Sequence, residues 1–287
     1  MSSPRYLLRR IRSISSTSQI TRAMQMVAAS KMRKAQEAAL STRPFVHLFY
    51  AMQREATCSM GKLAHPLLES REVRNRAVIL VSTDKGLCGS LNSNLFRAAL
   101  DFDIASTVYV AAGRRAAQFV ARTGRRLVAE FTYGDIPTIS EARAITSFAK
   151  NLYIAKTVDQ VLVVSTQFIN TLTQHTLTLE FLPVGEIHAL KIPGTEHIPH
   201  ERSEGYGYLF EPSASHVMAY LIPHYLDVYI YQVLLNARAS EQSARMVSMK
   251  NATDNAEDLI RDLTLEYNKL RQGNITRELL EIAGGRT

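Results

Sequence analysis

The sequence lacks any long hydrophobic run. No stretch of about 18 uninterrupted apolar residues is present, and a helix needs roughly that length to cross a lipid bilayer. The most apolar pieces, residues 77–81 and 161–164, have the length of strands. Because 46% of the 287 residues are hydrophobic and 21% are charged, we expect a soluble chain that buries a sizeable core and has no membrane-spanning helix.

Cysteine is also scarce, since Cys58 and Cys88 are the only two. Two cysteines make neither a disulfide framework nor a four-ligand zinc site, so a reducing compartment is expected. Among the eight histidines, His197 and His200 form a close pair in a segment that contains proline. No third or fourth ligand lies near them, so a solvated loop is favoured over a metal site.

Acidic residues are nearly absent from the start of the chain. Residues 1–40 hold eight Lys and Arg against the single acid Glu37, which accounts for +7 of the formal charge of +8. Residues 241–287 hold seven basic and eight acidic side chains, a net of −1. The two ends therefore have complementary charge, although exposed ion pairs contribute only about 0.5 kcal/mol each.

The first segment, residues 6–64, has the pattern of a long helix. Apolar or small residues recur in steps of three and four, which places them on one face. Pro44 is expected to kink this helix or to end its first part. The residues of this stripe are Leu7, Ile11, Ile14, Ser18, Thr21, Met24, Ala28, Met32, Ala35 and Ala39.

The middle segment alternates short strand patterns with helical ones. Residues 76–82, 107–112, 127–132 and 160–166 are expected to be strands of a mainly parallel sheet in an α/β layer. Residues 171–184 alternate apolar and polar side chains, which is typical of a partly solvated edge strand. Residues 194–207 are polar with Gly and Pro, and are expected to form a loop.

The last segment is helical from residue 212 nearly to Gly284, with Pro223 as its one expected interruption. Residues seven apart form two rows, one with Met249, Ala256, Leu263 and Leu270 and one with Thr253, Ile260 and Tyr267. Such a heptad seam requires a partner helix. The N-terminal helix is the one long partner available, so an antiparallel two-helix coiled coil with the α/β segment inserted is predicted.

Three alternatives to a purely structural role remain open from the residues themselves. The loop that begins at Thr83 and ends at Ser90 follows a strand and is glycine-containing, so it favours weakly an α/β enzyme or nucleotide-binding protein. The basic N-terminus is compatible with a nucleic-acid-binding coiled coil, although no aromatic residue lies between residues 7 and 44. A transit peptide is the third alternative, but the helical stripe runs without a break far past any cleavage point.

Two long motifs stand at opposite ends of the chain. The first comprises residues 10–14 (RIRSI) and 19–36 (QITRAMQMVAASKMRKAQ), and the second comprises residues 244–256 (ARMVSMKNATDNA), 263–272 (LTLEYNKLRQ) and 275–279 (ITREL). They resemble the N-terminal signature and the C-terminal end of the gamma subunit of F-type ATP synthase. The middle adds residues 84–89 (DKGLCG), 113–114 (GR) and 208–212 (YLFEP), so the resemblance covers essentially the whole chain.

The resemblance implies a rotary shaft. The implied fold is a long antiparallel two-helix coiled coil of residues 1–64 and 208–287, with a Rossmann-like α/β domain over residues 75–205. In this family the shaft stands inside a hexamer of alternating alpha and beta subunits, and its foot binds the epsilon subunit and the membrane c ring. Proton flow turns the ring, and the asymmetric shaft forces the beta sites through different affinities for ADP, phosphate and ATP.

The resemblance also implies that this chain has no catalytic residue, cofactor or metal of its own. It places the chain as a peripheral protein on the cytoplasmic face of the bacterial inner membrane or, alternatively, on the matrix side of the mitochondrial inner membrane. Gly273 and Asn274 depart from the family pattern by replacing better helix formers, at a cost of about 1 to 1.5 kcal/mol of local helicity.

Matching positions carry over the family's contact residues. They comprise Met24, Lys31 and Lys34 facing the beta lever loops, Arg271 and Gln272 meeting the beta catch loops with Thr276 and Glu278 nearby, and Tyr208, Phe210 and Glu211 at the foot against the c ring.

Overall fold

The computed structural model describes residues 4–41, 44, 65–184, 211 and 213–284. These residues fall into two compact units. The helix-pair unit contains residues 4–29 and 245–284, and the α/β unit contains the described residues from 30 to 244.

Two long helices belong to both units, and the elements between them belong to the α/β unit. The helix α1 spans Pro4–Ser41 and the helix α6 spans Ala214–Gly284. The strands are β1 (Arg76–Val81), β2 (Thr107–Ala112), β3 (Arg126–Phe131), β4 (Gln160–Phe168) and β5 (Gln174–Leu182). The shorter helices are α3 (Leu91–Leu100), α4 (Arg114–Arg122) and α5 (Ile139–Ile154).

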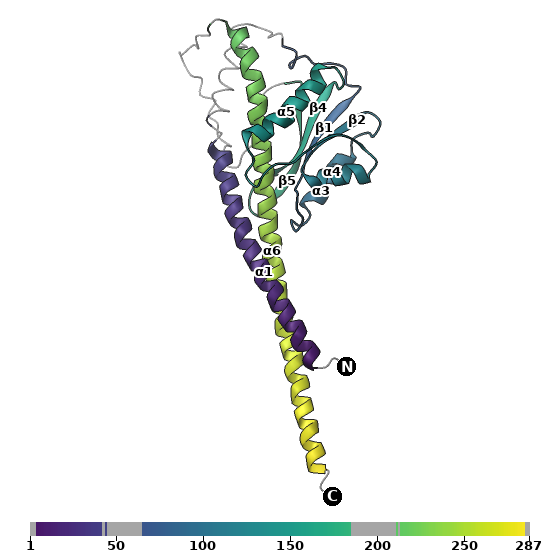
Figure 1. The fold of residues 1–287 in the computed structure, drawn as a ribbon, viewed down its shortest axis with the longest axis vertical. Helices are drawn as coiled ribbons and strands as arrows, with labels where there is room; N and C mark the ends of the chain where they lie inside the picture. Colours follow the sequence, from purple (N-terminus) through teal and green to yellow (C-terminus); the bar gives the residue numbers. More distant parts are fainter. Residues whose placement is uncertain (1–3, 42–43, 45–64, 185–210, 212, 285–287) are drawn as a thin grey trace. The chain divides into compact units, whose positions relative to one another are not determined.

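The five strands form one sheet in the order β3-β2-β1-β4-β5 (Figure 1). The pairs β1–β2, β2–β3 and β1–β4 are parallel, while β5 lies antiparallel to β4 at the edge. The alternating pattern of β5 reflects this position, because one face of an edge strand is partly solvated. The predicted mainly parallel sheet and its edge strand are both confirmed.

Each face of the sheet packs against its own pair of helices. The side chains of Val78 and Leu80 lie in one apolar cluster with residues of α3 and α4. Ala77, Ile79 and Val81 alternate with them and lie in a second cluster with α5 and with residues 218–237 of α6. The first half of α6 is therefore a core element of the α/β unit, and its burial against α5 and the sheet explains its apolar composition.

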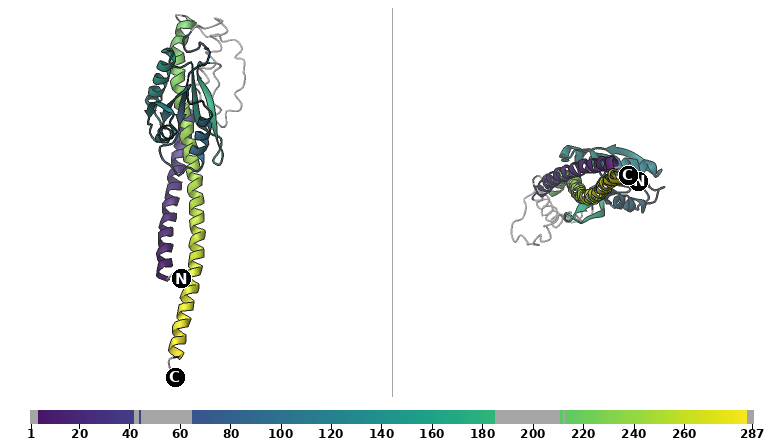
Figure 2. Two further views of the ribbon diagram at one scale, coloured as in Figure 1. Left: turned by 90° about the vertical axis from the view of Figure 1, so that its right-hand side faces the viewer. Right: turned by 90° about the horizontal axis from the view of Figure 1, so that it is seen from below.

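The helix-pair unit is an antiparallel pair of helices (Figure 2). On α1, Leu7, Ser18 and Ala28 are buried while most neighbouring residues are exposed. On α6, the buried residues of this unit include Met249, Thr253, Ala256 and Leu263. Their spacing of three, four and seven confirms the heptad seam and the coiled coil of the N- and C-terminal helices.

Two details differ from expectation or lie beyond the described residues. The helix α6 continues through Pro223, so the predicted interruption there is wrong. Burial of Ile222, Tyr225 and Leu226 on both sides of the proline holds the helical path despite the missing amide donor. The helix α1 ends at Ser41, and the expectations for residues 45–64 and 194–207 lie outside the described residues.

Candidate functional site

The three contact residues predicted on α1 lie in different environments. Met24 lies half-buried on the seam of the helix-pair unit. Lys31 and Lys34 belong to the α/β unit, where Lys34 is exposed. The ammonium nitrogen of Lys31 lies 2.6 Å from Oδ2 of Asp135, a residue of the loop after β3. This hydrogen bond holds the pKa of Asp135 below its ordinary value.

The predicted contact residues on α6 lie on a fully exposed stretch of helix. Every residue from 271 to 280 is exposed, and the four residues predicted to meet the beta subunit are Arg271, Gln272, Thr276 and Glu278. Large apolar side chains accompany them, because Ile275, Leu279 and Leu280 are 47%, 62% and 66% exposed. No described residue of the helix-pair unit covers this stretch, although it is helical throughout.

The residues predicted for the foot are only partly described. Tyr208 and Phe210 lie outside the described residues, and Glu211 is exposed at a bend just before α6.

Small and polar contacts join the two helices across the seam. The hydroxyl oxygens of Thr21 and Thr253 are 2.7 Å apart and share a hydrogen bond. Arg22 donates to Glu257 over 2.6 Å, but both side chains are more than a third exposed. Because solvent screens such a pair, the predicted attraction between the basic and acidic ends stabilises the unit only slightly, and the buried seam dominates.

The loop between Thr83 and Ser90 is a tight turn in which Thr83 bonds within the loop and to α3. The hydroxyl of Thr83 donates to the carbonyl of Lys85 over 2.7 Å, and the amide of Asn92 donates to Thr83 Oγ1 and to Cys88 Sγ. Cys88 is buried, as expected for an ordinary small thiol.

Left-handed backbone occurs in this loop at Leu87, with φ of 64°, and at Gly89, with φ of 58°. The left-handed conformation at position 89 favours glycine there. Gly86 has no positive φ, and an added Cβ there would lie 3.3 Å from the guanidinium of Arg115. A side chain at position 86 would therefore require the guanidinium of Arg115 to shift by a few tenths of an ångström.

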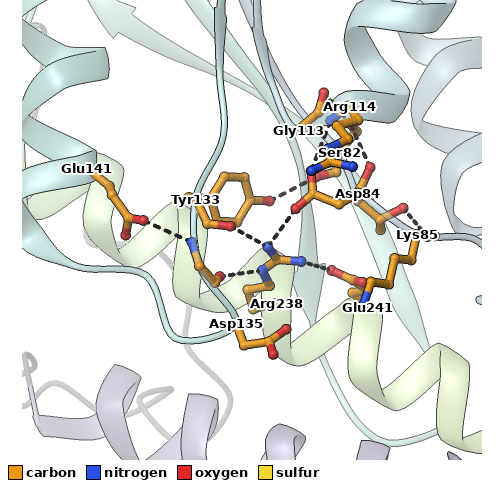
Figure 3. Close-up of polar contacts among 12 residues, drawn as sticks. Ser82, Asp84, Lys85, Gly113, Arg114, Tyr133, Asp135, Glu141, Arg238 and Glu241 are labelled. Atoms are coloured by element: carbon orange, nitrogen blue, oxygen red, sulfur yellow. Dashed lines mark hydrogen bonds and ion pairs between the residues drawn. The ribbon is translucent and has the colours of Figure 1, made fainter.

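A cluster of charged and polar groups around Arg238 of α6 lies at the carboxyl ends of the parallel strands (Figure 3). The guanidinium of Arg238 donates to the carboxylates of Asp84 (3.2 Å) and Glu241 (2.5 Å), and to the carbonyls of Tyr133 (2.8 Å) and Gly134 (3.1 Å). It also lies over the ring of Tyr133, 4.3 Å from its centre. We call these five residues the carboxyl-edge cluster.

Burial and charge together set the protonation states of this cluster. Burial acts against the charge of Arg238, but Tyr133, Glu241 and Asp84 oppose that effect, and the net result raises the pKa of the guanidinium further. Burial also raises the pKa of the Tyr133 hydroxyl, which stays neutral and donates to the carbonyl of Ser82 over 2.9 Å. The cluster is thus a fixed cation held by two carboxylates.

Arg238 and Glu241 were not among the functional residues expected from the sequence. The available signal was their spacing, because a charged pair at i and i+3 directly follows the apolar stretch of α6. Such a pair lies on one face of a helix and is expected to be bonded when that face is buried. Which loops would supply the remaining acceptors was not readable from the sequence.

The described residues were compared with the patterns of metal-ion sites and of membrane-spanning helices. Among them, no group of three or more His, Cys, Asp and Glu side chains converges in a way that would hold a metal ion. His197 and His200 lie outside the described part. No helix in the described part is long and apolar enough to span a membrane.

Comparison with protein families gives a match along nearly the whole chain. The family model described as ATP synthase matches residues 3–287. The ATP synthase gamma chain of Opitutus terrae is 44% identical over 99% of this chain and 97% of that relative. The ATP synthase gamma chain of Methylacidiphilum infernorum is 41% identical over 99% of this chain and 98% of the relative.

Solved structures of similar fold come from mitochondrial complexes. The Euglena gracilis ATP synthase, in a structure of OSCP, F1 and the c ring, contains a chain that matches with a TM-score of 0.67 at 17% identity, over 98% of this chain and 93% of that one. The central stalk and c-ring structure of the Tetrahymena thermophila enzyme matches with a TM-score of 0.59 at 22% identity, over 81% and 99%. At these identities the likeness concerns the fold.

Proposed function

Because this chain belongs to the family of ATP synthase gamma chains, we propose that it is the central-stalk rotor subunit of an F-type ATP synthase. In this role it transmits torque between the membrane c ring and a hexamer of alpha and beta subunits during ATP synthesis coupled to proton transport. The epsilon subunit binds beside it at the foot. The chain itself supplies no catalytic group, and ATP chemistry takes place on the beta subunits.

The observation that carries this proposal is the exposed stretch of α6 from residue 271 to residue 280. A helix gains most of its stability from packing rather than from propensity, and this stretch has large apolar side chains that no described residue covers. A partner protein that surrounds the stretch supplies the missing packing. Arg271, Gln272, Thr276 and Glu278 would then contact the beta subunits there.

The seam of the helix-pair unit suits a shaft that turns inside another protein. Its buried positions include Ser18, Ala28, Thr253 and Ala256, whose small side chains let the two helices approach closely. The side chains on the outward faces of these two helices are mostly exposed. A narrow pair of helices of this kind can rotate inside the surrounding subunits, because its side chains do not interlock deeply with theirs.

The contacts proposed for α1 involve the beta subunits through Met24, Lys31 and Lys34. Lys31 already has a partner within the chain, Asp135, so its contact with a beta subunit requires that this exposed pair be shared or broken. The cost is small, because solvent screens both groups. Tyr208, Phe210 and Glu211 are proposed to contact the c ring, and the complex lies on the cytoplasmic face of a bacterial inner membrane or its mitochondrial equivalent.

Co-assembly tests the proposed function. The chain is produced together with the alpha and beta subunits of the same genome, and the complex is purified and assayed for ATP hydrolysis. We expect stoichiometric co-purification, and Arg271→Ala should weaken assembly by about tenfold, equal to ~1.4 kcal/mol, because it removes a charged contact at the interface. Lys250→Ala, which changes an exposed cation of α6 outside the proposed contact set, is the matched control. Failure of the parent chain to join the two subunits would sink the proposal.

A further inference from the structure

Two loops of the α/β unit bond to one side chain of α6 at the carboxyl edge of the sheet, and a third loop lies beside them through a bond to Asp84. Asp84 follows β1, Gly113 and Arg114 follow β2, and the loop from Tyr133 to Asp135 follows β3. In open α/β sheets this edge is where ligands bind, because the loops after parallel strands present their polar groups there. Here the guanidinium of Arg238, from the same chain, occupies the edge (Figure 3).

All three nitrogens of the Arg238 guanidinium form hydrogen bonds, as in a well-bound ligand. The three nitrogens donate to four acceptors on three segments, namely Asp84, the carbonyls of Tyr133 and Gly134, and Glu241 of α6 itself. The Arg238 side chain is only 4% exposed. A planar, forked cation is the side chain that satisfies this many fixed acceptors at once.

The acceptors are in turn held in place by the domain. The second oxygen of Asp84 accepts from the amide of Arg114 at the start of α4, over 3.0 Å. The amide of Gly134 donates to Glu141, which belongs to the capping box of α5 with Thr138. The cavity that receives Arg238 is therefore built by β1, β3, α4 and α5 together rather than by one mobile loop.

The other contacts between α6 and the domain combine apolar packing with scattered polar bonds, such as those of Asp227 with the half-exposed Arg143 and of Ser243 with the carbonyl of Thr171. Residues 218–237 of α6 pack against α5 and the sheet through buried hydrophobic side chains. Apolar packing is not directional, so on its own it tolerates a small rotation or sliding of a helix. A buried charge with several fixed acceptors tolerates neither, because displacement leaves charges unpaired in a dry environment.

We infer that Arg238 is a positioning residue that fixes the rotational and axial register of α6 against the α/β domain by filling the domain's own ligand position. The consequence for rotation rests on the proposed function: a fixed register lets the domain and α6 turn as one body. The position of α6 against the domain concerns this chain alone. Removal of the guanidinium leaves a cavity lined by two carboxylates, two carbonyls and the Tyr133 ring, which is complementary to a free guanidinium ion.

Hydrogen exchange with chemical rescue tests the inference in the full chain. In Arg238→Ala we expect the amides of residues 112–116 and 133–135 to exchange on the order of 100-fold faster, because one partner of a buried ion pair is gone. Millimolar guanidinium chloride should restore most of this protection, whereas equal sodium chloride should not. Unchanged exchange in the variant, or exchange that guanidinium does not slow, overturns the inference.

Two further variants control this result. Arg143→Ala also removes an arginine that joins the domain to α6, through Asp227, but it leaves no enclosed cavity, since the Arg143 side chain is 55% exposed. Guanidinium should not rescue it. If Arg238→Ala fails to fold, Arg238→Lys replaces it: one ammonium cannot reach four acceptors, so faster exchange is expected, and parent-like exchange in that variant contradicts the inference.

Coupling measurements separate this inference from the proposed function. In membranes with the complete complex, the ratio of ATP-driven proton pumping to ATP hydrolysis should fall in Arg238→Ala and recover with guanidinium. If the parent chain couples normally and the variant has the same ratio, the register claim fails while the rotor function stands. If the parent chain itself supports no coupling, the rotor function fails, and the exchange experiment alone decides the role of Arg238.

Discussion

The same two helices are stabilised in opposite ways in the two units. In the α/β unit, nearly every residue of α6 from 225 to 243 is buried, and charged groups such as Asp227, Arg238 and Glu241 are enclosed with partners. In the helix-pair unit, the buried residues of α6 are mainly those of the seam, and the ion pair between Arg22 and Glu257 is exposed to solvent. The α/β unit therefore has a fixed internal arrangement, whereas the outer surface of the helix-pair unit is available to a partner protein.

The largest effect is expected from Gly113→Ala in the α/β unit. Gly113 has φ of 100°, and an added Cβ would lie 2.4 Å from the carbonyl oxygen of Ser82. Strain and the forced shift of β1 should cost about 3 kcal/mol of unfolding free energy. Gly124→Ala is the control, because φ is 65° but no atom lies within 4 Å of the new Cβ, so about 1 kcal/mol is expected. Denaturant unfolding measures both, and equal losses would contradict this account of Gly113.

A larger side chain in the seam should disturb the helix-pair unit next. Ala28 is 1% exposed, so Ala28→Leu forces the helices apart at an estimated cost of about 2 kcal/mol. The exposed Ala23→Leu should change stability by less than about 0.5 kcal/mol. Segment-resolved hydrogen exchange should show the loss of protection in residues 245–263 for Ala28→Leu only. Equal protection in the two variants would mean that this seam is not close-packed.

A smaller effect of opposite sign is expected at Gly273. Nothing lies within 4 Å of an added Cβ at this helical position. Gly273→Ala should therefore stabilise the exposed end of α6 by about 0.5 to 1 kcal/mol, through the higher helix propensity of alanine. Slower hydrogen exchange in residues 271–280 of the full chain is the measurement. Unchanged exchange there would show that helix propensity does not limit the stability of this stretch.

The smallest effect concerns Lys31 and Asp135 at low pH. Because Lys31 lowers the pKa of Asp135, the pair stabilises the α/β unit above the ordinary aspartate pKa of about 4, and this contribution is lost as the pH falls through the lowered value. Solvent exposure limits it to a few tenths of a kcal/mol. The difference in thermal midpoint between the parent and Asp135→Asn should shrink on going from pH 6 to pH 3. A difference that does not vary with pH would exclude the ionised pair as its cause.

The repeating features of this fold were predictable from the sequence. The steps of three, four and seven that include Leu7, Ser18, Met249 and Leu263 identified the seam, because a helix repeats its face at that period. The strands were identified to within three residues, because a strand alternates its faces or, when fully buried, forms a short apolar run. Pro223 misled because local propensity yields to tertiary packing when the flanking residues are buried.

Individual side-chain contacts between residues far apart in the sequence were not predictable. The ion pair of Lys31 with Asp135 joins residues 104 positions apart, and Arg238 meets Asp84 across 154 positions. Such pairs follow from the order of the strands, which periodicity does not determine. For the same reason, the family resemblance that implied a beta-subunit contact for Lys31 did not indicate its bond to Asp135 within the chain.

Direct observation of rotation tests the central claim most directly. The complex of this chain with its alpha and beta subunits is fixed to a surface through the beta subunits, and a probe is attached to the exposed face of the α/β unit, for example through a cysteine introduced at Arg122. The account predicts that ATP drives continued rotation of the probe in one direction. A probe that stays fixed, or that only fluctuates about one position while the complex hydrolyses ATP, would contradict a rotor function for this chain.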